Sequence, residues 1–268
     1  MERFYVLKLG GSIVTKKGEQ IPHIDQLFLK GLIRQIAQAR AIKPFRLILI
    51  RGVGSIGHGI VVKWGINDGV RTPHQKKGVQ ICLRATKRIG FTIVRLLKSH
   101  GMPAKFVDPS TFFEQRDKKL VTWNLEAYET LLDKGIIPVS TGSMVPDSTL
   151  GWSVMSGDRI IARLSKHFSP DYVLLGTDVD GVFTSDPKKD KRAKRISRIT
   201  NANLKKVGAL VGESMAVDVT RGKKGKLEEI VNLGSGAPVR IFSLKKKGAL
   251  RRILEHPSLN MGTLVRVG

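Results

Sequence analysis

Cysteine and long apolar segments are nearly absent from this sequence. Its 268 residues contain one cysteine, Cys82, which excludes an internal disulfide framework and a CxxC metal site. No segment reaches the roughly 18 consecutive apolar residues that a membrane helix needs. The first residues also lack the apolar core and cleavage site of a secretory signal. We therefore expect a cytoplasmic protein with no membrane partner, in which Cys82 fills space in an apolar helix.

Acidic residues are scarce relative to basic ones. The chain has 22 Asp and Glu against 47 Lys and Arg, a net charge of +25. Such a field attracts anions in general, including nucleotides, phosphorylated metabolites, RNA and acidic lipids. Basic residues are concentrated in 188–198, 221–226 and 245–252, without the interleaved aromatics or recognisable module that indicate nucleic-acid binding. We interpret the first and third runs as solvated surface. A nucleic-acid partner is not favoured, although the charge leaves it open.

Apolar β-type segments alternate with segments of helical periodicity along the chain. One long helical pattern covers residues 78–99. This alternation predicts an α/β fold with an open, mainly parallel sheet sandwiched by helices. Ligands in such sheets bind at the carboxyl ends of the strands. The predicted strands are residues 4–9, 46–50, 104–107, 136–139, 172–175 and 239–242.

Glycine-rich turns follow four of these predicted strands. They are Gly10-Gly11-Ser12, the run from 52 to 59, residues 141–143 and residues 176–181. Glycine lets backbone N–H groups approach a ligand closely, and a helix N-terminus behind the turn adds partial positive charge. Several such turns at one sheet edge predict a floor that binds phosphate.

The second glycine turn fits two nucleotide-binding motifs incompletely. Residues 52–57 form a literal GxGxxG, but the acidic residue that follows, Asp68, has no strand before it as a dinucleotide site requires. The turn also resembles a P-loop, except that His58 and Gly59 replace the lysine and hydroxyl residue. What remains is a glycine turn that presents His58 at the ligand edge, where a structural and a functional role are both open.

Candidate cations and carboxylates for phosphoryl transfer surround these turns. The reaction requires two anionic groups held in line and their repulsion neutralised. Lys8 lies in an apolar strand, where burial is costly without an anionic partner unless the strand is an edge strand that faces solvent. Asp158 follows the N-cap candidate Ser156 at a helix start. Asp178 and Asp180 flank a turn that ends at Gly181.

Taken in order, these motifs resemble the amino acid kinase superfamily along nearly the whole chain. The opening KLGGS of residues 8–12 is similar to the family's K-x-G-G-S, with Lys17 as its second lysine. Residues 156–158 resemble its S-G-D, and residues 177–183 its T-D-V-D-G-V loop. Residues 218–226 are similar to its D-V-T-G-G-M-x-x-K segment. Within the superfamily, GSIGH at residues 54–58 is most similar to the isopentenyl phosphate kinases, and the fosfomycin kinases resemble it closely.

The resemblance implies a reaction and a set of site residues. It implies ATP and Mg²⁺ as cofactors, a small phosphorylated substrate, direct in-line transfer to isopentenyl phosphate, and a homodimer. It implies an acceptor-binding lobe at 1–150, an ATP-binding lobe at 151–268, and an isoprenoid pocket bordered by Ile81, Ala85, Ile89 or Ile93. The implied catalytic residues are Lys8, Lys17 and His58; the substrate-binding residues are Gly52, Gly54, Ser55, Gly57, His58 and Gly142; the nucleotide-binding residues are Lys8, Gly10, Gly11, Ser12, Asp158, Asp178, Gly181 and Lys226.

The sequence departs from the family pattern at several of these positions. The family's three-glycine run is interrupted by Val53 and preceded by Arg51, its Gly-Asp becomes Gly142-Ser143, and Arg221 replaces a glycine. Because Val53 does not readily adopt a positive φ, we expect a reshaped turn. These departures keep two alternatives open. One is a kinase of another small phosphate or phosphonate, such as fosfomycin, and the other is a degenerate kinase fold that binds nucleotides or RNA as a regulator.

Overall fold

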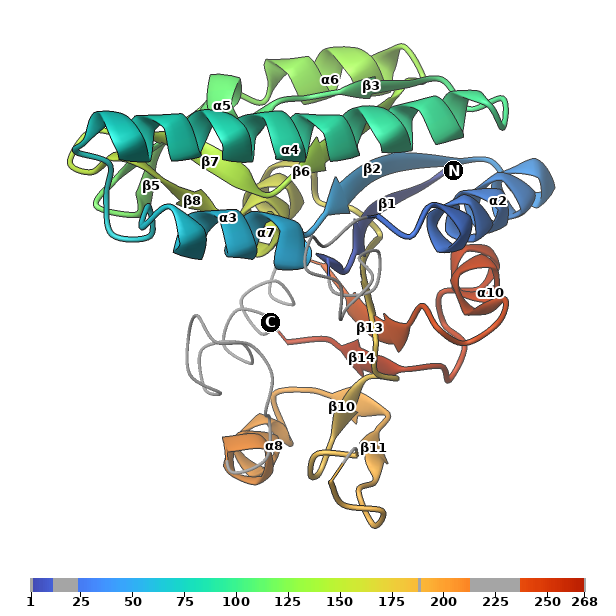
Figure 1. Cartoon of the computed structure of the whole chain (residues 1–268). Coiled ribbons are helices and arrows are strands. Elements are labelled where there is room, and N and C mark those ends of the chain that lie inside the picture. The colour runs from blue at the N-terminus through green and yellow to red at the C-terminus, as the bar shows by residue number, and fades with distance from the viewer. Residues whose placement is uncertain (1, 12–23, 188, 213–236, 268) are drawn as a thin grey trace.

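A computed structural model describes residues 2–11, 24–187, 189–212 and 237–267. Its centre is an eight-stranded sheet in which β13 and β14 are antiparallel and every other adjacent pair is parallel. All six predicted strands are present in it, and the predicted α/β class with a mainly parallel sheet is confirmed (Figure 1). The strand order is β12 (Arg198–Ile199), β14 (Thr263–Val265), β13 (Val239–Ser243), β9 (Tyr172–Thr177), β1 (Arg3–Leu9), β2 (Phe45–Arg51), β6 (Ile137–Thr141) and β3 (Ala104–Phe106).

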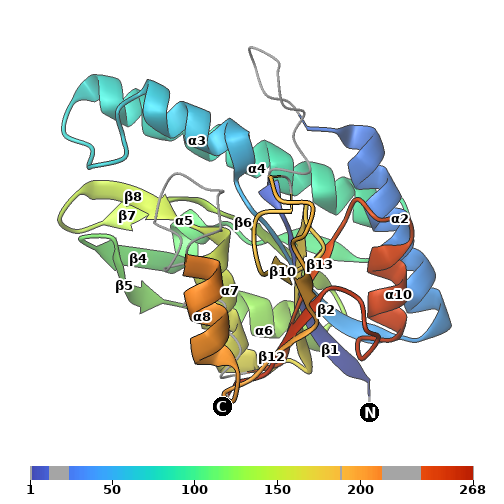
Figure 2. The same ribbon diagram turned by 90° about the horizontal axis from the view of Figure 1, so that it is seen from below.

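Helices cover both faces of this sheet. On one face, α2 (Gln26–Ile42), α4 (Pro73–Lys98) and α10 (Ala249–Glu255) pack against the alternate strand residues that include Tyr5 and Leu7. On the other face, α6 (Glu126–Asp133) and α7 (Gly157–Phe168) pack against the set that includes Phe4 and Val6. Helices α2 and α10 lie side by side, as the two views show (Figures 1 and 2).

Local sequence explains where the helices next to the site begin. Helix α4 starts with a capping box, in which the Thr72 hydroxyl accepts a hydrogen bond from the Gln75 N–H, and Pro73 occupies the first helical position. Helix α7 starts at Ser156, whose hydroxyl accepts from the Arg159 N–H at 3.2 Å. The helix predicted at 78–99 corresponds to α4, which begins earlier, at Pro73, and ends at Lys98.

A second sheet was not predicted from the sequence. Its order is β5 (Lys119–Trp123), β4 (Phe113–Arg116), β7 (Ser143–Asp147) and β8 (Gly151–Met155), next to α5 (Pro109–Phe112). The buried Asp147 joins its two hairpins. Burial alone would raise the pKa of Asp147, but hydrogen bonds from Lys118, Ser153, Leu150 and Thr149 outweigh it and lower the pKa to about 2.

Shorter elements complete the described part of the chain. They are α3 (Gly54–Lys63), α8 (Leu204–Gly212), β10 (Val182–Phe183) and β11 (Arg195–Ile196). Cys82 lies in α4 and is buried, as expected, and burial raises the pKa of its thiol to about 11. Across the described residues, no helix combines the length and apolar character that crossing a membrane requires.

The register of the central strands aligns the glycine turns. Leu9 pairs with both Arg51 and Gly176, and Arg51 pairs in turn with Thr141. The strands β1, β2, β6 and β9 therefore end at one level of the sheet. The turns that follow them meet at a single edge, as the parallel arrangement predicts.

Candidate active site

The turns after β1 and β2 are in direct backbone contact. Gly10 N–H donates to the Gly176 carbonyl at 2.9 Å, and Gly52 N–H donates to the Leu9 carbonyl at 3.1 Å. A Cβ atom on Gly11 would stand 2.7 Å from the Gly52 carbonyl oxygen and 2.6 Å from the Gly54 Cα. Such distances exclude a side chain, so glycine at position 11 is required for the two turns to approach each other.

Lys8 lies beneath these turns and is paired with a carboxylate. Strand β1 is central, between β9 and β2, so Lys8 is not on an edge strand. Its Nζ lies 2.5 Å from Asp158 Oδ1, with 16% of the lysine side chain and 30% of the aspartate side chain exposed. Its Cε lies 3.5 Å from the point that a Cβ on Gly52 would occupy. The cost of burying this cation is met by Asp158, which itself lies in the first turn of α7, where negative charge is favourable.

Two further glycines let the start of α7 reach the second turn. Gly142 N–H donates to the Arg51 carbonyl at 3.0 Å. A Cβ on Gly142 would stand 3.1 Å from Gly157 N, and a Cβ on Gly157 would stand 3.4 Å from the Arg51 carbonyl oxygen. The ends of β2 and β6 and the start of α7 are therefore packed backbone to backbone.

Helix α3 presents an uncapped N-terminus and His58 at this edge. In the described part of the chain no side chain forms a capping hydrogen bond at Val53, and the N-terminus of a helix favours an anion. His58 is exposed, and its ring forms no hydrogen bond with any other residue in the described part of the chain. It borders a narrow cavity with a free volume of about 10 Å³, lined by Val53, Gly57, His58, Val61, Cys82, Ser143, Met144 and Val154.

In the second turn, the positive φ angle falls on Gly54 and not on Val53, as expected for a β-branched residue. Val53 adopts φ −62°, and Gly54 takes the positive φ, +62°. One Val53 methyl group occupies the space that a Cβ on Gly57 would need, and the other lies 2.5 Å from the point where a Cβ on Gly142 would stand. Val53 therefore narrows the turn on the side of the cavity. Ser143, which replaces the family's acid, lies with its hydroxyl 3.0 Å from that of Thr86 on α4.

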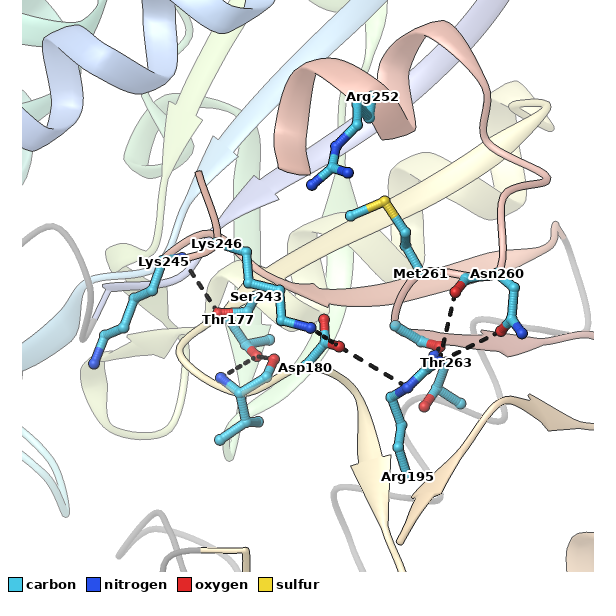
Figure 3. A network of polar contacts seen from close by, with 12 residues as sticks. Thr177, Asp180, Arg195, Ser243, Lys245, Lys246, Arg252, Asn260, Met261 and Thr263 are labelled. Atoms are coloured by element: carbon cyan, nitrogen blue, oxygen red, sulfur yellow. Dashed lines mark hydrogen bonds and ion pairs between the residues drawn. The ribbon is translucent and has the colours of Figure 1, made fainter. Parts of the chain in front are cut away.

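A second polar cluster follows β9 and β13 at the same sheet edge. Asp180 lies between two cations, with Lys246 Nζ at 2.5 Å and Arg195 Nε at 3.9 Å from its Oδ2 (Figure 3). Gly181 has φ +110°, and a Cβ there would stand 2.8 Å from Thr263 N, so both backbone angle and space require glycine. Thr177 Oγ1 donates to the Val179 carbonyl at 2.8 Å and holds the same turn.

Sequence reasoning missed the two cations of this cluster. Arg195 and Lys246 belong to the basic runs 188–198 and 245–252, which we interpreted as solvated surface. Composition gave no signal that one member of each run would contact Asp180, because the three residues come from separate parts of the chain, with Arg195 in β11.

Several predicted site residues lie outside the described residues. These are Ser12, Lys17 and Lys226, and for Ser55 only the backbone is described. Of the residues predicted to border an isoprenoid pocket, Ile89 and Ile93 are buried against the sheet, and the cavity beside His58 is lined from α4 by Cys82. The structure brings together at one edge Lys8, Gly10, Gly11, Gly52, Gly54, Gly57, His58, Gly142 and Asp158, with Asp178 and Gly181 in the turn after the adjacent strand β9.

Comparisons with known proteins identify the family to which the chain is similar. The family model described as "Amino acid kinase family" matches residues 3–243. The isopentenyl phosphate kinase of Methanothermobacter thermautotrophicus is 31% identical over 256 residues, covering 93% of this chain and 94% of that one. The isopentenyl phosphate kinase of Methanocaldococcus jannaschii is 32% identical, covering 84% and 85%.

More distant relatives include enzymes with other names. The uridylate kinase of Nitrobacter winogradskyi is 26% identical and covers 98% of this chain and 97% of its own. Among solved structures, an isopentenyl phosphate kinase superposes with a TM-score of 0.79 at 26% identity, covering 98% of this chain and 100% of that one. The chain therefore belongs to the amino acid kinase family, as a small-molecule kinase.

Proposed function

We propose that this protein transfers the γ-phosphoryl group of ATP to isopentenyl phosphate, giving isopentenyl diphosphate and ADP. An oxygen of the acceptor phosphate attacks the γ-phosphorus in line, and the bond from that phosphorus to the β,γ-bridging oxygen breaks. The observation that carries the proposal is the position of Lys8, paired with Asp158 beneath two apposed glycine turns. Relatives named isopentenyl phosphate kinase, about 30% identical over most of the chain, support the choice of acceptor.

In this proposal the glycine turns and Lys8 neutralise the two phosphate groups. Backbone N–H groups at a helix N-terminus and a lysine act on charge that moves during transfer, and they are fixed before the reaction begins. Asp158 keeps the Lys8 ammonium directed at the turns, since the two atoms are 2.5 Å apart. Lys17, Ser12 and Lys226 are assigned by resemblance alone, as a second catalytic lysine and as ATP-phosphate ligands.

We assign the phosphate end of the acceptor to His58 and its hydrocarbon end to the cavity beside His58. The His58 ring has no partner among the described residues, so it is available to donate to the acceptor phosphate. The cavity beside it is lined mainly by apolar side chains, but its free volume of about 10 Å³ has room for no more than one water molecule. In this proposal the acceptor phosphate lies at His58, and the hydrocarbon tail enters the apolar cavity as the side chains around it move apart.

The site also fits ATP with Mg²⁺. Gly11 is buried where the two turns pack together, whereas Gly52 and Gly54 are partly exposed and carry no side chain, so the second turn offers backbone to a phosphate group. Mg²⁺ in kinases is held largely by substrate phosphates with one or two carboxylates, and here Asp158 and Asp178 are the candidates. When bound, the ion neutralises charge on the β- and γ-phosphates. We assign the acceptor to residues 1–150 and ATP to 151–268, and we expect a cytoplasmic homodimer from the resemblance.

An acceptor panel with a His58→Ala variant tests the proposal. We expect the wild type to prefer isopentenyl phosphate over fosfomycin, UMP and a carboxylate. His58→Ala should lower kcat/KM for isopentenyl phosphate about 10²-fold, the range for loss of one group that stabilises the transferring charge. His256→Ala, which removes an exposed histidine away from the turns, is the control and should be unaffected. Preference for another acceptor, or an unchanged rate in His58→Ala, would reject the assignment.

The alternative of a non-catalytic regulator is tested by adding an RNA-binding measurement to the acceptor panel. Tight RNA binding with a steep salt dependence, together with no phosphoryl transfer to any acceptor, would favour it. The Lys8–Asp158 pair favours the enzyme, as does the His58 ring, which has no partner among the described residues, because a regulator needs neither.

A further inference from the structure

Arg51 is a buried cation at the end of β2 that the proposed chemistry does not use. Its side chain is fully buried, and no carboxylate in the described residues forms an ion pair with it. Burial lowers the pKa of Arg51 to about 10, so the guanidinium stays charged at neutral pH. Its Nη1 donates to the Val53 carbonyl at 2.9 Å, whereas Nε and Nη2 have no hydrogen-bond partner among the described residues. A buried charge without a counter-charge is costly, and this one lies directly before the second glycine turn.

The hydrogen bond from Arg51 fixes the direction of one peptide group. The carbonyl of Val53 and the N–H of Gly54 belong to the same trans peptide and point in opposite directions. With the carbonyl held by Arg51, the Gly54 N–H is directed away from the guanidinium. Gly54 N lies against Gly11, at the point that a Cβ on Gly11 would occupy. The amide therefore lies between the two apposed turns.

Two restraints act on this peptide. Val53 is the N-cap of α3, so its carbonyl faces the first turn of that helix, and the Arg51 guanidinium adds a donor from outside the helix. Gly52 and Gly54 permit backbone rotations that other residues resist, so without Arg51 the Val53–Gly54 peptide at this helix end has more freedom to reverse. A reversed peptide would present the Val53 carbonyl, an acceptor with partial negative charge, to a bound phosphate. Phosphate is bound by N–H groups and repelled by carbonyl oxygens, so the direction of this peptide decides whether the turn attracts its ligand.

We infer that Arg51 is a positioning residue that locks the Val53–Gly54 peptide with its N–H toward the phosphorylated acceptor. The inference rests on the proposed function in one respect, that the acceptor phosphate binds at this turn. Val53 and Arg51 then act together. Val53 occupies the space beside Gly57 and Gly142, and Arg51 holds the Val53 carbonyl away from the ligand.

Substitution of Arg51 is compared with substitution of a second buried arginine. Arg240 on β13 is 2% exposed and also donates to backbone carbonyls, from Nη1 to Met261 at 3.1 Å and from Nη2 to Pro257 at 2.8 Å. Arg51→Met should lower kcat/KM for the acceptor about 10- to 100-fold, as loss of a supporting hydrogen bond does. The KM for ATP should stay within about twofold, and Arg51→Lys should recover part of the loss, because an ammonium can still donate to Val53. Arg240→Met should leave the acceptor kcat/KM unchanged.

A binding readout separates this inference from the proposed function. In the wild type, titration with inorganic phosphate should shift the amide NMR signal of Gly54, and in Arg51→Met that shift should disappear. If the wild type fails to phosphorylate isopentenyl phosphate but Gly54 responds in this way, the proposed acceptor is wrong and the role of Arg51 stands. The inference would be overturned if Arg51→Met and Arg240→Met lost the same amount of acceptor kcat/KM, or if Arg51→Met affected the KM for ATP as much as the acceptor kcat/KM. It would also be overturned if phosphate shifted the Gly54 signal equally in Arg51→Met and in the wild type.

Discussion

Lys8 and Asp158 are 150 positions apart in the sequence, yet Lys8 Nζ lies 2.5 Å from Asp158 Oδ1. The contact joins the end of the central strand β1 to the first turn of α7. It also joins two motifs that were recognised separately in the sequence, KLGGS and SGD. The pair places a directed cation under the glycine turns.

The first prediction concerns this pair. Asp158→Asn should lower kcat about tenfold or more, because Lys8 loses the charge that directs it, while stability should change by only about 1 kcal/mol for a partly exposed pair. Lys8→Met should lower kcat further, since the cation itself is removed. The double variant should be no slower than Lys8→Met, as expected when two residues act as a unit.

The control for this pair is an exposed one. Asp68 accepts from Lys118 Nζ at 2.9 Å and its side chain is 83% exposed. Asp68→Asn should leave kcat and KM unchanged. Steady-state kinetics on the four variants measures the coupling, and fully additive losses from Lys8→Met and Asp158→Asn would show that the two side chains act independently.

The second prediction concerns the contact between Val53 and Gly57, where a Val53 methyl group fills the space that a side chain at position 57 would need. In the wild type, Gly57→Ala should be destabilising, because its Cβ would overlap a Val53 methyl group. In a Val53→Gly background the same change should stabilise the protein by about 1 kcal/mol, the helix preference of alanine over glycine. Urea unfolding of the four proteins gives the sign of each change. The same sign in both backgrounds would contradict the contact.

Val53→Gly alone should also widen the acceptor range. Removing the side chain enlarges the cavity beside His58, so a longer prenyl phosphate should gain in kcat/KM relative to isopentenyl phosphate. Leu27→Gly, a change at a residue that is 85% exposed on α2, serves as the control and should alter neither value. An unchanged ratio between the two acceptors would mean that Val53 does not limit the cavity.

The third prediction is a pH dependence of stability through Asp147. Its pKa is lowered to about 2 in the folded protein, below the value of about 3.9 for an unfolded chain. The carboxylate therefore contributes stability that is present above pH 4 and is lost as the pH falls toward 2. The shift corresponds to about 2 kcal/mol.

Unfolding at pH 7 and at pH 2.5 measures this contribution. Asp147→Asn should be less stable than the wild type at pH 7, because an amide offers fewer acceptor sites to the surrounding N–H groups, and the difference should shrink at pH 2.5. Asp133→Asn, at a side chain that is 78% exposed, should show no such convergence. A gap for Asp147→Asn that is constant with pH would exclude the ionised form as the source.

The sequence alone determined the strands, the glycine turns and the family motifs, because each depends only on residues that are close together in the sequence. Runs such as 4–9 and 46–50 identify strands because their apolar content and length are local properties. Glycines directly after those strands indicate the ligand edge, since a mainly parallel sheet brings its strand ends together. The family motifs at 8–12, 156–158 and 177–183 are local too, which is why the fold and the kinase class were predicted correctly.

Only the tertiary structure decided which distant residues meet. Strand β1 could be recognised from its residues, but its central place in the sheet, which removes Lys8 from solvent, depends on β9 and β2 packing on either side. Asp180 contacts Arg195 and Lys246 for the same reason, since folding brings together three segments that are far apart in the sequence. The second sheet was missed because its strands are short and are held by Asp147 rather than by a long alternating pattern. Hydrophobic periodicity depends only on residues that are close in the sequence. Contacts between residues far apart in the sequence depend on how whole helices and strands pack.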